Sequence, residues 1–139
     1  MSWEIICYKG VPDYLKEASA CFACVFGLWG WEIHLRLSDD PGRDGSRSSY
    51  GSCKTWGDGL HVTIEIDREH AENGKKAEVL ETLLHEFLHL AIADLDRDAR
   101  CGLSDELYAA FKRTNERTVC RLTMGMKSMI PHILKTYRK

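Results

Sequence analysis

The feature that most constrains this chain is a long segment of helical character that carries two histidines four residues apart. The pentapeptide His85-Glu86-Phe87-Leu88-His89 lies in Lys75–Asp96, a segment with no Gly or Pro and rich in Ala, Leu and Glu. Its apolar residues recur at helical spacing: Val79, Leu80, Leu83, Leu84, Phe87, Leu88, Ala91, Ile92 and Leu95. Residues four apart share one face of a helix, so both imidazoles can reach one metal ion.

The pattern His-Glu-x-x-His is typical of zinc peptidases, in which the two histidines bind Zn²⁺. Glu86 directly follows the first histidine and is placed to hold and deprotonate a zinc-bound water. The alternative is a pair of partly buried helix histidines that bond backbone carbonyls. Burying two histidines and a glutamate at this spacing is costly unless they are used. We therefore predict one Zn²⁺ per chain, held by His85 and His89 with a third ligand, and Glu86 as the catalytic residue.

Length and composition predict one domain, residues 1–139, with room for a real core but little for a second one. The hydrophobic fraction of 44% and the charged fraction of 29% are ordinary for a globular protein. A net charge of −2 gives no reason to expect a nucleic-acid or membrane partner. The first residues lack the character of a signal peptide, and Ala18–Trp31 is too short and too rich in Gly to span a bilayer. We expect a cytoplasmic protein.

The chain has six cysteines, which in a reducing cytosol are expected to be free thiols. Cys21 and Cys24 form a single CxxC pair that could serve redox chemistry or half a zinc site. No second pair follows, and this one lies in an apolar helical run, where cysteine packs as a small hydrophobe. We interpret the pair as structural.

The order of the expected elements predicts an α+β domain with an N-terminal helix, a small mixed sheet, the motif helix packed on the sheet, and a C-terminal helix. Strands are expected at Trp3–Tyr8, Trp31–Leu37, Tyr50–Trp56 and Leu60–Asp67, and helices from Pro12 to Gly27, over Lys75–Asp96 and from Ser104 to about Met126. In the last strand Val62, Ile64 and Ile66 point to one side.

The remaining segments are expected to be polar connections, namely Ser38–Ser49, Gly57–Gly59, Arg68–Gly74 and Arg97–Gly102. Pro131 is expected to interrupt the last helical segment, and a solvated basic tail is expected from Lys135. Ser38–Ser49 is long enough to cover a cleft, although a plain surface loop is the simpler interpretation.

A catalytic zinc takes a third protein ligand, and the residue that supplies it distinguishes the families of zinc peptidases. The metzincin pattern requires Gly where Ile92 stands and His where Leu95 stands, so it is excluded. His132 lies next to Pro131 in the tail, far along the chain from the motif. Two glutamates of the following helix remain.

Glu106 and Glu116 are the two candidates for the third ligand. Glu106 projects nearly opposite the expected buried stripe, and as a first-turn acid it is already explained by the positive end of the helix. That stripe consists of Leu107, Phe111, Val119 and Leu122. Glu116 lies at the edge of the stripe and can point inward. We favour Glu116, with Glu106 as the alternative.

With these residues identified, Leu28–Leu122 resembles the gluzincins, zinc peptidases that use HExxH and a downstream glutamate. More narrowly, it resembles small single-domain metallopeptidases of phages and prophages. The resemblance rests on residues 27–33, 61–67, 82–90, 95–96 and 115–122. Asn115-Glu116 is similar to the pair that carries the third ligand in thermolysin-like enzymes. A more distant similarity is to the peptidases that cleave repressors of mobile elements and radiation-response genes.

The resemblance implies a zincin fold whose sheet has an edge strand that pairs antiparallel with an extended peptide. We expect zinc-dependent peptide hydrolysis with Glu86 as general base, later passing the proton to the leaving amine. The partner would be an extended peptide or protein bound along Leu60–Asp67 by β-augmentation.

Four further side chains each have two possible roles. A second hydrogen-bond donor to the oxyanion could come from Tyr108, His34 or His61, each also explained as a structural residue. Asp96 could accept a hydrogen bond from a ligand histidine, or lie at the surface. Two other interpretations stay open. One is a catalytically lapsed, zinc-stabilised protein-binding module of phage origin. The other is a phage structural or regulatory protein in which HExxH arose by chance.

Overall fold

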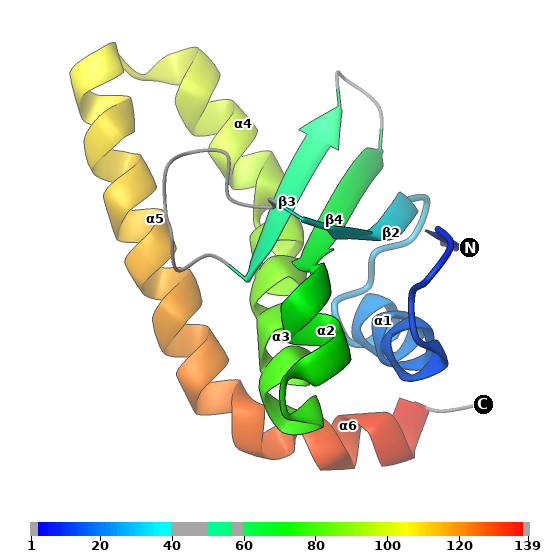
Figure 1. The fold of residues 1–139 in the computed structure, drawn as a ribbon. Helices are drawn as coiled ribbons and strands as arrows, with labels where there is room; N and C mark the ends of the chain where they lie inside the picture. The colour runs from blue at the N-terminus through cyan, green and yellow to red at the C-terminus, as the bar shows by residue number, and fades with distance from the viewer. Residues whose placement is uncertain (1–2, 40–49, 57–59, 138–139) are drawn as a thin grey trace.

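Four short strands form a mixed sheet, α1 (Asp13–Val25) and α3 (Lys76–Ala91) pack against it, and the longest helix, α5 (Asp105–Met126), packs on α3 (Figure 1). The computed structural model describes residues 3–39, 50–56 and 60–137. In chain order the elements are β1 (Glu4–Cys7), α1 (Asp13–Val25), β2 (Glu32–Ser38), β3 (Gly51–Trp56), β4 (His61–Asp67), α2 (Arg68–Asn73), α3 (Lys76–Ala91), α4 (Ala93–Gly102), α5 (Asp105–Met126), the 3₁₀ turn η1 (Lys127–Met129) and α6 (Ile130–Tyr137). The predicted α+β class is confirmed. Of the predicted connections, Gly57–Gly59 and all of Ser38–Ser49 after Asp39 lie outside the described residues.

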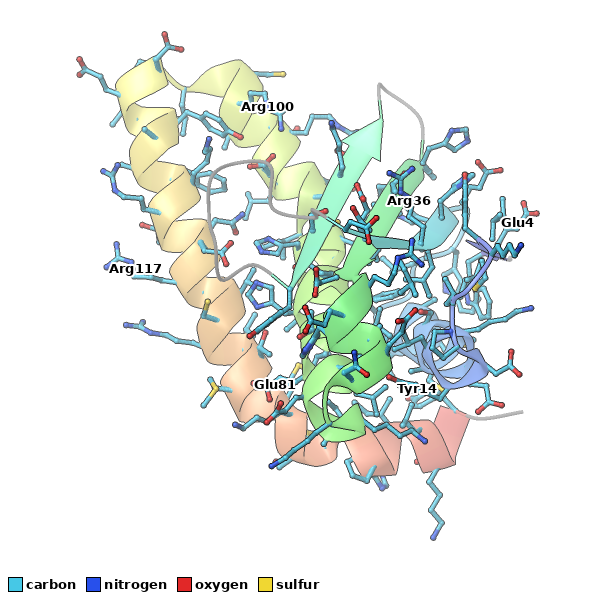
Figure 2. All side chains as sticks on the ribbon, viewed as in Figure 1. Glu4, Tyr14, Arg36, Glu81, Arg100 and Arg117 are labelled. Atoms are coloured by element: carbon cyan, nitrogen blue, oxygen red, sulfur yellow. The ribbon has the colours of Figure 1, made fainter. Side chains whose placement is uncertain are left out.

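The strands are ordered β1-β2-β4-β3 across the sheet. β1, β2 and β4 are parallel, whereas β3 is antiparallel to β4 and forms one edge. Val62, Ile64 and Ile66 are fully buried, as their alternation predicts. The intervening residues point to the other face of the sheet, where Arg36, labelled in Figure 2, forms an ion pair of 3.3 Å with Glu65.

The apolar face of the sheet is covered by α1 and α3, which also pack against each other. Phe22 of α1 meets Phe87 of α3 edge to face, with ring centroids 5.7 Å apart. Cys21 of the CxxC pair is buried in this core and Cys24 is partly exposed, which agrees with a structural role. None of the helices in the described part of the chain combines the length and the apolar surface that crossing a bilayer requires.

The predicted motif helix Lys75–Asp96 is divided into two helices. α3 ends at Ala91, because Ile92 (φ −112°, ψ 16°) leaves the helical region, and α4 begins at Ala93. The acidic residues that follow the break then lie in the first turn of α4, where the positive end of the helix favours them. The prediction of a break over Arg97–Gly102 was therefore wrong, since those residues are helical.

The polar segment Arg68–Gly74, predicted as a connection, contains the helix α2. The side chain of Asp67 caps it by accepting a hydrogen bond of 3.0 Å from the backbone N–H of His70. Asp67 is also the last residue of β4, so the same residue ends the strand and caps the helix that follows.

α5 begins where predicted, with Ser104 accepting from the N–H of Leu107 at 3.3 Å. The predicted buried stripe was only partly right. Val119 is buried, but the side chains of Leu107 and Leu122 are 59% and 41% exposed. Among the described residues, α5 contacts mainly α3, α4 and η1, and most of its side chains are exposed (Figure 1).

Pro131 begins a helix and does not interrupt one. It is the second residue of α6, where the missing N–H is not needed for a helical hydrogen bond. α6 packs against α1, with Ile130 and Ile133 buried. The predicted basic tail therefore starts inside a helix, although Lys135 is exposed, as expected.

Gly51 allows β3 to approach α3 closely. A Cβ atom at this position would lie 3.0 Å from Thr82 Cγ2 and 3.2 Å from both Glu86 Cγ and the carbonyl oxygen of Glu65. At such distances the neighbouring atoms would have to move. The glycine thus sets the spacing between the edge strand and the motif helix.

Replacing Gly51 with Ala is expected to destabilise the protein by about 1–3 kcal/mol, because the methyl group overpacks this contact. Urea-induced unfolding of the wild type and the variant measures the difference. Adding Thr82→Ser removes the methyl group at 3.0 Å and keeps the hydroxyl that bonds His70, so part of the stability should return. Equal stability of Gly51→Ala and the wild type would contradict the close approach.

Candidate metal centre

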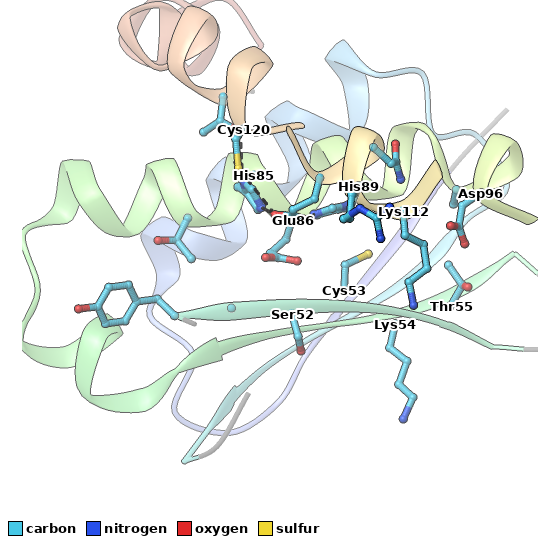
Figure 3. Close-up of a pocket in the computed structure, with 18 of the residues that line it drawn as sticks. Ser52, Cys53, Lys54, Thr55, His85, Glu86, His89, Asp96, Lys112 and Cys120 are labelled. Carbon is cyan, nitrogen blue, oxygen red and sulfur yellow. Dashed lines mark hydrogen bonds and ion pairs between the residues drawn. The ribbon is translucent and has the colours of Figure 1, made fainter. Parts of the chain in front are cut away.

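The two motif histidines lie on adjacent turns of α3, on the side of the helix that faces away from the core. Their ring centroids are 4.9 Å apart, and their side chains are 22% and 24% exposed. Glu86, between them in sequence, is only 5% exposed and points toward β3 (Figure 3). The helix thus presents two imidazoles to an open cleft and keeps one carboxyl group largely out of water.

Glu116 of α5 contacts both histidines. Its Oε1 lies 3.1 Å from His85 Nε2, and its Oε2 lies 2.9 Å from His89 Nε2. Glu106, the alternative third ligand, is exposed in the first turn of α5. The structure therefore brings together the three predicted ligand residues from two helices that are separate in sequence.

The charges of this cluster depend on one another. Hydrogen bonds from His85 and His89 hold the pKa of Glu116 well below its usual range. Burial lowers the pKa of His89, but the hydrogen bond to Glu116 and the nearby negative charges of Glu86, Glu116 and Asp96 together raise it above its usual value. Two imidazole nitrogens converge on one carboxylate, and either ring protons or a metal cation can lie between these nitrogens and the carboxylate oxygens.

Thr123 contacts His85 at Nδ1, the ring nitrogen that does not face Glu116, and can thereby orient the ring. Thr123 was not identified from the sequence. Its hydroxyl donates to the carbonyl oxygen of Val119 at 2.8 Å, so the same oxygen can only accept from His85 Nδ1, which lies 3.2 Å away. Without a metal, Nε2 then needs a second proton in order to donate to Glu116. With its proton on Nδ1 alone, neutral His85 offers the Nε2 lone pair to a metal ion between the ring and Glu116. This is the tautomer that a metal ligand requires.

The buried position of Glu86 changes the acidity of its carboxyl group. Desolvation raises the pKa of Glu86 to about 7, despite the opposing effect of the two histidines. Cys53 of β3 faces it across the narrow gap (Figure 3), and burial, with a smaller effect of Glu86, raises the pKa of the Cys53 thiol far above its usual range. A carboxyl group with a pKa near neutrality can both accept and return a proton.

The cleft in front of these residues runs between β3 on one side and α4 and α5 on the other, with α3 at its base. Of the three candidates for a second oxyanion donor, Tyr108 lines the cleft. His34 and His61 lie on the opposite face of the sheet, where both contact Glu32, at 2.9 and 3.5 Å. Neither histidine is in position to act on a ligand in this cleft.

Asp96 lines the same cleft but bonds other partners than the ligand histidines. It accepts hydrogen bonds from Tyr108 at 3.0 Å and from Arg100 at 2.9 Å. The bond from Tyr108 connects α4 to the first turn of α5, whereas Arg100 lies on α4 itself. Among the described residues around the cluster, Thr123 makes the contact with a motif histidine that the sequence interpretation had considered for Asp96.

The strand predicted to bind an extended peptide was the wrong one. β4 (His61–Asp67) is paired with β2 on one side and β3 on the other, so its backbone groups are already used. The edge strand beside the cleft is β3. The N–H of Asp67 donates to the carbonyl of Tyr50 at 2.8 Å, and the alternation of an antiparallel pair then directs the backbone groups of Cys53 and Thr55 away from β4.

A group of side chains at this site could hold a metal ion. Ligand atoms of His85, Glu116 and Cys120 all lie within 4.8 Å of one another. His89 joins them through its 2.9 Å contact with Glu116. The donors are imidazole nitrogen, carboxylate oxygen and thiol sulfur, a combination suited to Zn²⁺. Cys120 was not identified from the sequence as a donor, because its distance to the motif depends on how α5 packs on α3.

Comparison of the chain with protein-family models, with curated proteins and with solved structures found no match.

Replacing Thr123 with Val keeps the shape of the side chain and removes the acceptor for His85 Nδ1. Zn²⁺ is expected to bind about 10–100-fold more weakly, the usual cost of losing a group that orients a ligand histidine. Competition with a chromophoric chelator measures the affinity. Thr123→Ser, which retains the hydroxyl, is the matched control and should bind Zn²⁺ nearly as the wild type does. An unchanged affinity in Thr123→Val would remove the orienting role.

Glu86→Gln is expected to change how the stability of the metal-free protein depends on pH. Because the pKa of Glu86 is about 7 in the folded protein and 4.5 is the ordinary value, the wild type loses stability as pH rises through this interval. Gln does not titrate, so from pH 5 to 8 the variant should gain about 2.5 kcal/mol relative to the wild type. Urea unfolding with a chelator present measures it, and a difference independent of pH would refute the raised pKa.

Proposed function

We propose that this protein is a zinc-dependent metallopeptidase of the gluzincin type, which hydrolyses peptide bonds. The proposal is carried by one observation, the convergence of both motif histidines on the single carboxylate of Glu116. A motif that arose by chance would have no reason to meet a carboxylate from another helix in this way. Glu86 and an edge strand next to the same cluster supply the remaining requirements of a peptidase.

The donor set fits zinc in a catalytic site. His85, His89 and Glu116 would hold the ion with two nitrogen atoms and one oxygen atom, and such sites leave a fourth position open. When bound, Zn²⁺ acidifies water to a pKa near 7 and polarises the carbonyl of the substrate.

Glu86 then acts as the general base. It accepts a proton from the attacking water and passes it to the amine that leaves, so the carboxyl group returns to its starting state. Its burial beside β3 supports this role, because a pKa of about 7 suits proton transfer in both directions near neutral pH. Tyr108 lines the cleft and remains the candidate for a second donor to the oxyanion, a role in which its hydroxyl proton would turn from Asp96 to the substrate.

We propose that the substrate is an extended segment of a peptide or protein, bound along β3 and not along β4. Backbone groups of Cys53 and Thr55 that point away from β4 support this, since an added strand forms main-chain hydrogen bonds with an edge of this kind. A peptide antiparallel to β3 would pass Thr55 first and Gly51 last, with its scissile bond above Glu86. Origin in a phage or prophage, and residence in the host cytosol, remain expectations from the sequence resemblance.

The alternative proposal is a zinc-stabilised binding module that no longer cleaves its partner. It shares the metal ligands and the edge strand and differs only in the use of Glu86. A purely structural site does not need a buried glutamate one residue after a ligand, and keeping it there costs free energy. This cost favours the peptidase.

The test of the proposed function is hydrolysis of a mixed peptide library by the zinc-loaded protein, with cleavage products identified by mass spectrometry. Glu86→Gln should keep its zinc and lose at least about 10²-fold in rate, because it removes the proton acceptor and not a ligand. Retained hydrolysis by purified Glu86→Gln would exclude the mechanism. Cleavage by neither protein, with zinc bound to both, would favour the binding module.

Zinc content separates the two glutamates of α5 as a matched pair. Elemental mass spectrometry of the wild type is expected to give about one zinc per chain. Glu116→Ala should lose it, whereas Glu106→Ala, which changes an exposed glutamate of the same helix, should keep it. Zinc retained by Glu116→Ala, or no zinc in the wild type after resupply, would refute the proposed site.

A further inference from the structure

Cys120 lies one helical turn after Glu116 on α5 and faces the same cluster (Figure 3). Its Sγ is 3.7 Å from Glu116 Oε1, to which the thiol donates, and it lies within 4.8 Å of a ring nitrogen of His85. Residues four apart on a helix share one face, so the packing that brings Glu116 to the histidines also brings this sulfur. The mechanism proposed above gives it no role.

We propose that Cys120 is a fourth protein ligand of the metal, through its thiolate sulfur. This inference rests on the metal site of the proposed function and adds a sulfur donor to His85, His89 and Glu116. With Cys120 bound, the ion is held by four protein atoms, and the position needed for water and substrate is closed. The protein therefore has a resting state that opens when the sulfur leaves.

The spacing of the donor atoms supports this assignment. On a tetrahedral zinc ion, a sulfur about 2.3 Å from the metal and an oxygen about 2.1 Å from it are separated by about 3.6 Å. The distance from Cys120 Sγ to Glu116 Oε1 is 3.7 Å. The two atoms are therefore already placed as neighbouring ligands of one ion.

The sulfur can also leave without disturbing the fold. Cys120 is exposed, whereas its neighbour Val119 is fully buried and fixes α5 to the core. Rotation about χ1 would carry Sγ into solvent and break no core contact. The Cys120 sulfur can therefore leave the metal and return to it. A site that is closed at rest and opens for substrate requires such an exchangeable ligand.

Other cysteines provide a competitor and a control. Cys53 lines the same cleft, but its thiol faces Glu86 and is not in the His85–Glu116 group. Cys101 is an exposed cysteine on the neighbouring helix α4 and does not line the cleft. Cys101→Ser therefore matches Cys120→Ser in exposure and in the atom changed.

The experiment replaces zinc by Co²⁺ in the full chain and records the near-ultraviolet and visible spectrum. Cobalt bound by a thiolate shows a sulfur-to-cobalt charge-transfer band, which cobalt bound only by nitrogen and oxygen lacks. The wild type and Cys101→Ser should show this band with one Co²⁺ bound, and Cys120→Ser should lose it. Cys120→Ser should also bind Cd²⁺, which prefers sulfur, at least about ten-fold more weakly.

The outcomes separate this inference from the proposed function. If the wild type binds Co²⁺ without a charge-transfer band, the metal site stands and Cys120 is not a ligand. If the band persists in Cys120→Ser and disappears in Cys53→Ser, the sulfur comes from β3 and the inference is overturned. If the folded wild type binds no Co²⁺, both the inference and the metal site are wrong. Circular dichroism of each variant confirms that it is folded.

Discussion

The apolar face of α3 is buried between the sheet and α1, and the position of the candidate site depends on this burial. Leu83, Leu84 and Phe87 are fully buried, and each such side chain contributes about 1.5–3 kcal/mol relative to exposure. With that face fixed, the 3.6-residue period leaves His85 and His89 on the opposite side, toward the cleft. The same helix that anchors the core therefore holds two of the candidate ligands at a fixed separation.

The third candidate ligand, Glu116, belongs to a helix with far less of its surface buried. Val119 and Thr123 are the buried residues of α5, and the hydroxyl oxygen of Thr123 accepts a hydrogen bond from His85. The contacts of Glu116 with both histidines add to this thin interface between α5 and α3. A metal ion bound at the same point would join the two helices through bonds stronger than those hydrogen bonds. Metal binding would then contribute directly to the stability of the α5 position.

Local patterns in the sequence predicted the elements well. The alternation in His61–Asp67, the apolar period of α3 and the Ser104 cap each depend on neighbouring residues, and all three are present in the structure. The end of α3 at Ile92 was missed because Ala, Leu and Asp continue the helical pattern past it. The cap of α2 was missed because Asp67 was interpreted only as a strand residue.

Features that depend on how elements pack could not be predicted in the same way. The alternation of apolar residues in β4 does not reveal that β3 pairs with β4 on the side away from β2, so that β3 and not β4 is the edge strand. The rotation of α5 about its axis decides which residues meet α3, and it leaves Leu122 exposed while it buries Thr123. Glu116 was favoured from its place at the edge of a stripe, and its contacts agree. Thr123 and Cys120 follow from the same rotation, which no local pattern revealed.

The two carboxyl groups of the site differ in environment, and this difference assigns their roles. Glu116 lies between two imidazoles in a partly open cleft, so its pKa is lowered and it stays ionised, as a metal ligand must be. Glu86 lies on the side of α3 that faces β3. Burial there raises its pKa to about 7, an effect larger than the lowering of the pKa by the same two imidazoles. Pairs of acids whose pKa values are pushed apart in this way commonly divide into a permanent charge and a proton carrier. The close approach permitted by Gly51 excludes water from Glu86, so a residue with no side chain helps to determine which carboxyl group carries the proton.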